Sequence, residues 1–244
     1  MKFSIIIFPG SNCDQDCVYV LRDLLKQDVI EVFHSEEKLP DKTDCVILPG
    51  GFSYGDYLRA GAISRFSKIS NSIIDFAKKG GLVMGICNGF QILCEMGLLP
   101  GALTKNKSLS FVCDEVYLKV VNNKTLFTSL YKEGEVIKIP IAHGEGSYVN
   151  NKIDKNQIIF QYCDKDGNVT PESNPNGSIL NIAGIAGSFS PSPHLPISPS
   201  FNVLGMMPHP ERASEKILRS EDGRRLFESV IASRGMACNT AAKI

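Results

Sequence analysis

One cysteine lies in a sequence context that could make it a nucleophile. Residues 85–89 read G-I-C-N-G, so Cys87 stands between two glycines, after an apolar run and before a helical pattern. This is the form of a nucleophile elbow, in which a strand turns sharply into a helix. Glycines leave room for the strained turn, and the helix start favours a thiolate. On this stretch alone, a nucleophile and a buried structural cysteine are about equally well supported.

Neighbouring residues could complete a site for acyl transfer. The N–H of Asn88 would point to where an oxyanion forms. Gln91, one helical turn beyond Cys87, would face a substrate held over the sulfur. Gly50 and Gly51 end an earlier apolar run, at the sheet edge where open α/β sheets bind ligands, so Gly51 could offer a second oxyanion N–H. These positions shift the balance towards a functional cysteine.

A cysteine nucleophile also needs a base, and the sequence has 4 histidines. His34 ends a short strand and His194 lies in a Ser/Pro-rich segment, so we expect neither to hold a fixed catalytic geometry. His209 follows an apolar run, lies between two prolines, and has Glu211 two residues on. In an extended segment the two side chains would point to the same side, so the carboxylate could orient the imidazole. We therefore expect His209 to be the base, and His143, in A-H-G-E-G, to line the site.

The elements that would position these residues alternate between strand and helix in the first half. Short apolar runs predict strands, and amphipathic patterns between them predict helices. The strands are expected at 3–8, 29–33, 45–48 and 82–86, and the helices at 18–26, 63–79 and 88–98. This alternation predicts an α/β fold with a mostly parallel open sheet and helices on both faces, as in flavodoxin-like proteins.

The second half is richer in strands. Apolar segments predict strands at 108–121, 135–143 and 157–163, which would extend the sheet in antiparallel fashion. Residues 202–212 predict a last strand that runs into the turn with His209, and 215–234 a closing helix. The length of 244 residues suits one domain over 1–244.

Residues 187–202 are crowded with serine and proline and predict a mobile loop within that domain. The loop could be a lid, a partner contact or a tolerated insertion. We favour a tolerated insertion, because surface loops cost little closure entropy.

Composition excludes several classes of protein. Lys plus Arg and Asp plus Glu are both 26, so the formal net charge is zero and no basic stripe indicates a nucleic-acid partner. No apolar run approaches the roughly 20 residues that span a bilayer, and the N-terminal run is too short for a secretory signal. The 8 cysteines lack zinc-site spacing. We therefore predict reduced thiols, no metal, no membrane and a cytoplasmic protein.

Cys87 in its elbow and the distant H-x-E at 209–211 together resemble the class I (triad) glutamine amidotransferases. Four stretches resemble one branch in particular, the small stand-alone glutaminase subunits of phosphoribosylformylglycinamidine synthase. They are LPGGFSYGDYLRAGAI at 48–63, GICNGFQIL at 85–93, PIAHGEG at 140–146 and NVLGMMPHPER at 202–212. The first stretch is specific to that branch, whereas the elbow marks only the superfamily.

The resemblance implies a role for each matched residue. These are the catalytic Cys87, His209 and Glu211, the oxyanion-binding Gly51 and Asn88, and the glutamine-binding Gly50, Gln91, Ala142, His143, Gly144 and Glu145. The thiolate would attack the side-chain amide of glutamine, release ammonia and leave a γ-glutamyl thioester for water to hydrolyse. One departure is Ser110, where the branch leads us to expect a basic residue.

The chain has no G-x-x-x-x-G-K-[ST] loop, so its ammonia would be used by another chain. The resemblance implies a large synthetase subunit, which uses ATP and Mg to make formylglycinamidine ribonucleotide from formylglycinamide ribonucleotide in purine biosynthesis, and a small bridging subunit. This chain itself would need no cofactor. Two alternatives stay open: a partner-independent γ-glutamyl or small-peptide cysteine hydrolase, and a binding subunit with a decayed site.

Overall fold

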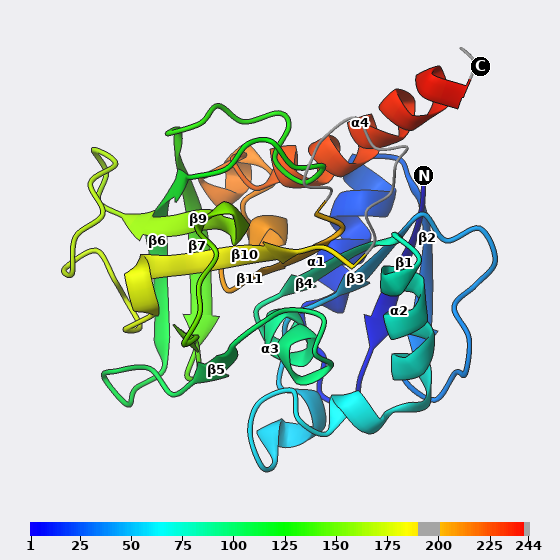
Figure 1. Ribbon diagram of the computed structural model, residues 1–244, viewed down its shortest axis with the longest axis horizontal. Coiled ribbons are helices and arrows are strands. Elements are labelled where there is room, and N and C mark those ends of the chain that lie inside the picture. Colours follow the sequence, from blue (N-terminus) through cyan, green and yellow to red (C-terminus); the bar gives the residue numbers. More distant parts are fainter. Residues whose placement is uncertain (190–200, 242–244) are drawn as a thin grey trace.

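The computed structural model describes residues 1–189 and 201–241, with side chains described up to residue 233 (Figure 1). Most of the loop predicted at 187–202 therefore lies outside the described residues. Among the residues that are described, no helix is both long and apolar enough to cross a membrane.

Strands from both halves of the described chain join one sheet, in the order β2-β1-β3-β4-β11-β10-β9-β6-β7. The first five strands in that order are parallel: β2 (Asp28–Phe33), β1 (Lys2–Ile7), β3 (Cys45–Leu48), β4 (Leu82–Ile86) and β11 (Val203–Met206). The other four pair antiparallel: β10 (Ile182–Gly187), β9 (Ile158–Cys163), β6 (Val112–Val120) and β7 (Val136–His143). The sequence-based prediction of a parallel sheet with an antiparallel extension is thus confirmed.

The two parts of the sheet differ in how they are covered. Every residue of β3 and β4 is buried, as expected for parallel strands with helices on both faces. In β7, buried and half-buried residues alternate, which is typical of an antiparallel strand with only one face against the core. The central parallel strands are therefore buried on both faces, whereas β7 is fully buried on one face only.

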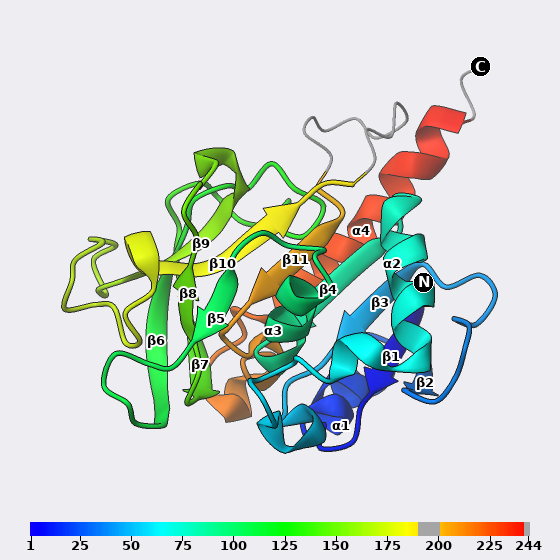
Figure 2. The same ribbon diagram turned by 60° about the horizontal axis from the view of Figure 1, so that its bottom comes forward.

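Four α-helices are described: α1 (Asp14–Val18), α2 (Lys68–Lys78), α3 (Asn88–Glu95) and α4 (Arg224–Ala241). Figure 2 shows α2 and α3 on one face of the parallel strands, with α1 and α4 behind them. The order of β4 and β11 places the start of α3 at the edge where these two strands end.

Several predicted boundaries were wrong. The helix expected at 63–79 is split, because Ser67 is extended (ψ 149°) between a 3₁₀ turn at Ser64–Phe66 and α2. The helix expected at 215–234 begins only at Arg224, since a separate 3₁₀ turn ends at Arg219 in the left-handed region (φ 71°). The helix expected at 18–26 begins earlier, as α1, and continues as a π-helix over Tyr19–Leu24.

Three strands were not predicted. The short strands β5 (Ala102–Thr104) and β8 (Ser147–Val149) pair only with each other. They have three residues each, too few for a pattern of period two to stand out. Strand β10 reads I-A-G-I-A-G, and its small residues hide it from the usual β-branched signal.

Candidate active site

Cys87 occupies a strained turn between β4 and α3. Its backbone has φ 51° and ψ −106°, a conformation that a non-glycine residue adopts only when its surroundings impose it. The N–H of Cys87 donates to the carbonyl of Met206 at 2.8 Å, which ties the turn to the end of β11. The sulfur lies 3.6 Å from the carbonyl oxygen of Ala142, on β7. The elbow therefore holds the sulfur at the meeting point of the two parts of the sheet.

The glycines around Cys87 are required by close packing. A Cβ on Gly89 would overlap the backbone carbonyl of Leu48, at the end of β3. A Cβ on Gly85 would lie 2.6 Å from both the carbonyl carbon of Gly89 and a methyl group of Leu93. The sequence-based argument that these positions must lack side chains agrees with this packing.

His209 reaches the same edge from the neighbouring strand. Strands β4 and β11 are in register with Ile86 opposite Met206, so the residues that follow them emerge side by side. The N–H of His209 donates to the carbonyl of Pro140 at 2.8 Å, which fixes the turn against β7. The imidazole is thereby held between the two parts of the sheet.

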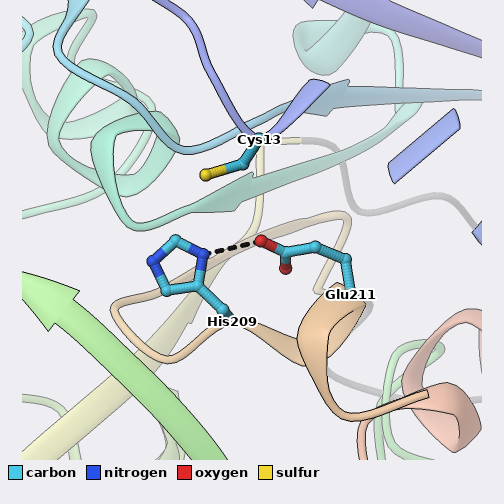
Figure 3. Close-up of side chains that lie close together, drawn as sticks. All are labelled: Cys13, His209 and Glu211. Carbon is cyan, nitrogen blue, oxygen red and sulfur yellow. Dashed lines mark hydrogen bonds and ion pairs between the residues drawn. The ribbon is translucent and has the colours of Figure 1, made fainter. Parts of the chain in front are cut away.

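Glu211 binds the imidazole directly. Its Oε1 lies 2.6 Å from Nδ1 of His209, and the two side chains are only 0% and 2% exposed (Figure 3). The contact was predicted, but the predicted reason was wrong. Pro210–Arg212 form a 3₁₀ turn, not an extended segment, so the turn and not strand alternation brings the two side chains together.

The charge state of His209 follows from this pairing. Burial lowers the pKa of His209, but the negative charges of Glu211 and Cys87, together with contacts from the thiols of Cys13 and Cys87, raise it above the usual value for histidine. Nε2 of His209 is buried and, among the described residues, has no hydrogen-bond partner. The raised pKa makes His209 a stronger base than a free histidine, and Nε2 is the ring nitrogen left to exchange a proton.

Cys13 completes a compact group with these two side chains. Its sulfur, a ring nitrogen of His209 and a carboxylate oxygen of Glu211 all lie within 4.8 Å of one another (Figure 3). Arg212 donates from Nη2 to the sulfur of Cys13 at 3.2 Å. A thiol, an imidazole and a carboxylate could ligate a soft divalent cation. Because Nδ1 and the carboxylate are already bonded to each other, the geometry fits a histidine–carboxylate pair better than a metal centre.

Two adjoining cavities open at Cys87. The larger, about 300 Å³, is lined by Gly51, Phe52, Asp56, Cys87, Gln91, Lys105, Leu109, Ser110, Phe111, Ala142, His143, Gly144 and Glu145. The smaller, about 150 Å³, is lined by Asn12, Cys13, Gly51, Phe52, Cys87, Phe111, Ala142, His209 and Arg212. Cys87 lines both cavities, so a substrate in the larger one would meet the sulfur with His209 beyond it.

The residues expected to bind the oxyanion lie after Cys87 in the chain or line the same cavities. Asn88 is the first residue of α3, so its N–H has no acceptor inside the helix. Its side chain points elsewhere, because Oδ1 accepts from the N–H of Ser53 at 3.2 Å. Gly51 lines both cavities, whereas Gly50 packs beside the histidine: a Cβ there would lie 2.8 Å from Cε1 of His209.

Gln91 lines the larger cavity, but its amide is engaged within the protein. Nε2 donates to the carbonyl of Glu145 at 2.6 Å, and Oε1 accepts from Nδ2 of Asn88 at 2.8 Å. Gln91 therefore links α3 to the segment 144–146, which follows β7. A direct contact of Gln91 with the substrate stays a prediction. The structure shows in addition that the Gln91 amide holds α3 against Glu145.

His143 is held as a neutral side chain. Nδ1 lies 3.1 Å from Oδ1 of Asn106, and Nε2 lies 3.4 Å from Nδ2 of Asn176, so Nδ1 donates and Nε2 accepts. Burial, and then the positive charge of His209, lower the pKa of His143 to about 4. It lines the larger cavity together with Cys87 and does not carry protons near neutral pH.

Sequence reasoning missed three polar residues near the nucleophile: Cys13, Asp56 and Lys105. Lys105 lines the same cavity as Ser110, so a cation is present in the cavity although position 110 lacks one. The signal for Asp56 was available, because it belongs to the G-G-F-S-Y-G-D stretch. No spacing rule connects Cys13 to residues nearly 200 positions later.

Comparisons with known proteins show the family of the chain. The model of the CobB/CobQ-like glutamine amidotransferase domain matches residues 1–228. The chain is 55% identical over 232 residues to the phosphoribosylformylglycinamidine synthase subunit PurQ of Pseudothermotoga lettingae, covering 94% of each chain. It is also 55% identical over 237 residues to that of Moorella thermoacetica, covering 95% of each. Among solved structures it matches a chain of PurLQS from Thermotoga maritima, with a TM-score of 0.81, 44% identity, and coverage of 95% of this chain and 97% of that one.

Proposed function

This chain belongs to the CobB/CobQ-like glutamine amidotransferase family, and we propose that Cys87, His209 and Glu211 are its catalytic residues. The observation that carries this assignment is the buried pair of His209 and Glu211, 2.6 Å apart, beside a cysteine in a strained elbow. These residues would supply a nucleophile, a base and an orienting carboxylate at the edge where β4 and β11 end.

The reaction follows from these positions. His209 accepts the thiol proton of Cys87, and the thiolate attacks the side-chain amide carbon of glutamine. The N–H groups of Gly51 and Asn88 stabilise the oxyanion. His209 then donates its proton to the departing nitrogen, so ammonia leaves and a γ-glutamyl thioester remains. Next, His209 takes a proton from water, and the resulting hydroxide releases glutamate and restores the thiol.

The chain supplies the glutaminase activity of phosphoribosylformylglycinamidine synthase. It hydrolyses glutamine and passes ammonia to a large synthetase subunit, and a small bridging subunit completes the complex. The synthetase makes formylglycinamidine ribonucleotide from formylglycinamide ribonucleotide in de novo purine biosynthesis. We propose that ATP and Mg are used by that subunit, because the chemistry assigned to Cys87 needs neither.

Two further points belong to the proposal. The first is that 1–244 is one amidotransferase domain, which is supported by strands from both halves of the chain sharing one sheet. The second is a cytoplasmic location. It is supported by the described cysteines, which are free thiols, as expected in a reducing compartment.

Replacement of the nucleophile tests the catalytic assignment. In the assembled synthase, Cys87→Ala should lower glutamine-dependent turnover by roughly 1,000-fold or more. Turnover with added ammonia should stay near the wild-type rate, because the synthetase is intact. The matched control is Cys113→Ala, which removes an exposed cysteine on β6. Full glutamine-dependent activity in Cys87→Ala would show that the nucleophile lies elsewhere.

A further inference from the structure

The cavity over Cys87 contains charged groups that the reaction at the amide does not use. Asp56, Lys105 and Glu145 all line it, together with the titratable Cys87 and His143. The two carboxyl groups can pair with the ammonium of an amino-acid zwitterion, and the amino group can pair with its carboxylate. The cavity thus has features suited to the end of glutamine that lies away from the reacting amide.

Asp56 is held in an unusual position. It lies in a short turn with φ 54°, next to Tyr54 and Gly55, which also have positive φ. Its Oδ1 is buried and, in the part of the chain that the structure describes, has no hydrogen-bond partner. A buried carboxylate oxygen without a donor is costly, so a ligand that donates there gains binding free energy.

Glu145 is the second acid, and its position is fixed from both sides. Its carbonyl accepts from Gln91, and its Oε2 accepts from the N–H of Ala60 at 3.3 Å. Burial, and then the negative charge of Glu145, raise the pKa of Asp56 to about 6. The two acids are therefore close enough to repel each other, and a cation between them would relieve that repulsion.

We propose that Asp56 and Glu145 bind the α-ammonium group of glutamine, which makes Asp56 a specificity-determining residue of the site. The inference rests on the proposed glutaminase function. An ammonium is favoured over a metal ion because the acids share their cavity with Cys87, where the other end of the same substrate must lie. Lys105 is then the cation in the cavity that is available to the α-carboxylate.

Substrate comparison in the assembled synthase tests this inference. Asp56→Asn should lower kcat/KM for glutamine on the order of 30-fold, mainly through KM, because one partner of a desolvated charge pair is lost. For 4-carbamoylbutanoate, which lacks the α-ammonium, the same substitution should change kcat/KM less than about 3-fold. Asparagine tolerates the left-handed backbone, so the turn should survive. The matched control is Asp114→Asn, an exposed acid on β6.

The pH dependence gives a second readout. Below about pH 6, Asp56 becomes protonated in the free enzyme, so the wild-type KM for glutamine should rise as the pH falls. In Asp56→Asn this rise should be smaller, because Glu145 alone remains. His143 contributes little there, since its pKa is about 4.

Two results would overturn the inference. One is an equal loss for both substrates, which would mean that Asp56 supports the elbow and not the ammonium. The other is an unchanged KM for glutamine. Either result leaves the catalytic assignment untouched, provided that Cys87→Ala still abolishes glutamine-dependent turnover. If Cys87→Ala were active, the proposed function would fail first.

Discussion

The parallel and antiparallel parts of the sheet contribute differently to the site. In the proposed mechanism the parallel part supplies the reacting groups, because Cys87 follows β4 and His209 follows β11. The antiparallel part supplies a wall, through Ala142 at the end of β7 and the 144–146 segment after it. On this proposal, the reaction depends on backbone turns at the ends of buried parallel strands, and a separate surface holds the substrate.

The histidines in the two parts of the sheet also have pKa values that are shifted in opposite directions. Glu211 pairs with His209 and helps to raise its pKa, whereas burial against amide groups lowers the pKa of His143 to about 4. One histidine is prepared to carry a proton and the other to stay neutral. Histidine is therefore the proposed base in one region and a structural hydrogen-bonding group in the other.

The largest expected effect comes from a glycine-to-alanine substitution at the elbow, which can be compared with the same substitution in the wall. Gly89→Ala places a Cβ against the carbonyl of Leu48, so the elbow must distort. We expect a loss of at least about 3 kcal/mol in the free energy of unfolding, with glutaminase activity abolished. Urea denaturation and turnover in the assembled synthase measure the two effects.

The matched substitution is Gly144→Ala in the wall. A Cβ at Gly144 would lie 3.8 Å from a ring carbon of Phe111, an ordinary contact. The free energy of unfolding should change by about 0.5 kcal/mol or less. Equal destabilisation by both substitutions would contradict the tighter packing around Gly89 than around Gly144.

A smaller effect concerns the pH dependence of stability. The unfolded chain protonates His143 near pH 6.5, but the folded chain does not until about pH 4. Stability should therefore fall as pH falls, and between pH 7 and pH 5 this group should cost about 2 kcal/mol. In His143→Gln that part of the dependence should vanish, as urea titrations at both pH values would reveal. His209 acts with the opposite sign, because its raised pKa favours the folded state at low pH and loses this effect as pH rises.

A pH dependence that is the same in wild type and His143→Gln would mean that His143 titrates normally. The assignment of a neutral His143 that donates from Nδ1 to Asn106 would then be wrong. His34 offers a control, because it is a half-buried histidine outside the site whose Nδ1 contacts the hydroxyl of Tyr54. His34→Gln should leave the acid dependence close to that of the wild type.

The parallel region was the easier of the two to predict from sequence. Strands β1, β3 and β4 appear as apolar runs, and the elbow glycines mark the turn after β4. The contact of His209 with Glu211 was also predicted, although the 3₁₀ turn that makes it was not. Local patterns carry this information because the residues concerned are close in sequence.

The wall was harder to predict because its contacts are long-range. Asn106 and Asn176 reach His143 from 37 and 33 residues away, and Asp56 shares its cavity with Glu145 only after folding. Neither sequence periodicity nor a spacing rule predicts such long-range pairs. The strand β10 was missed as well, since its alanines and glycines give no strand signal.

The central claim is that the pair of His209 and Glu211 activates Cys87, and labelling of the thiol tests it most directly. A glutamine-mimicking electrophile should modify Cys87 in the wild type, with Cys13 and the exposed Cys113 unlabelled in the same mass spectra. Glu211→Gln should slow labelling of Cys87 roughly 100-fold, because the imidazole loses the carboxylate that orients it and raises its pKa. Labelling of Cys87 at the wild-type rate in Glu211→Gln, or labelling of Cys113 in preference to Cys87, would contradict the account.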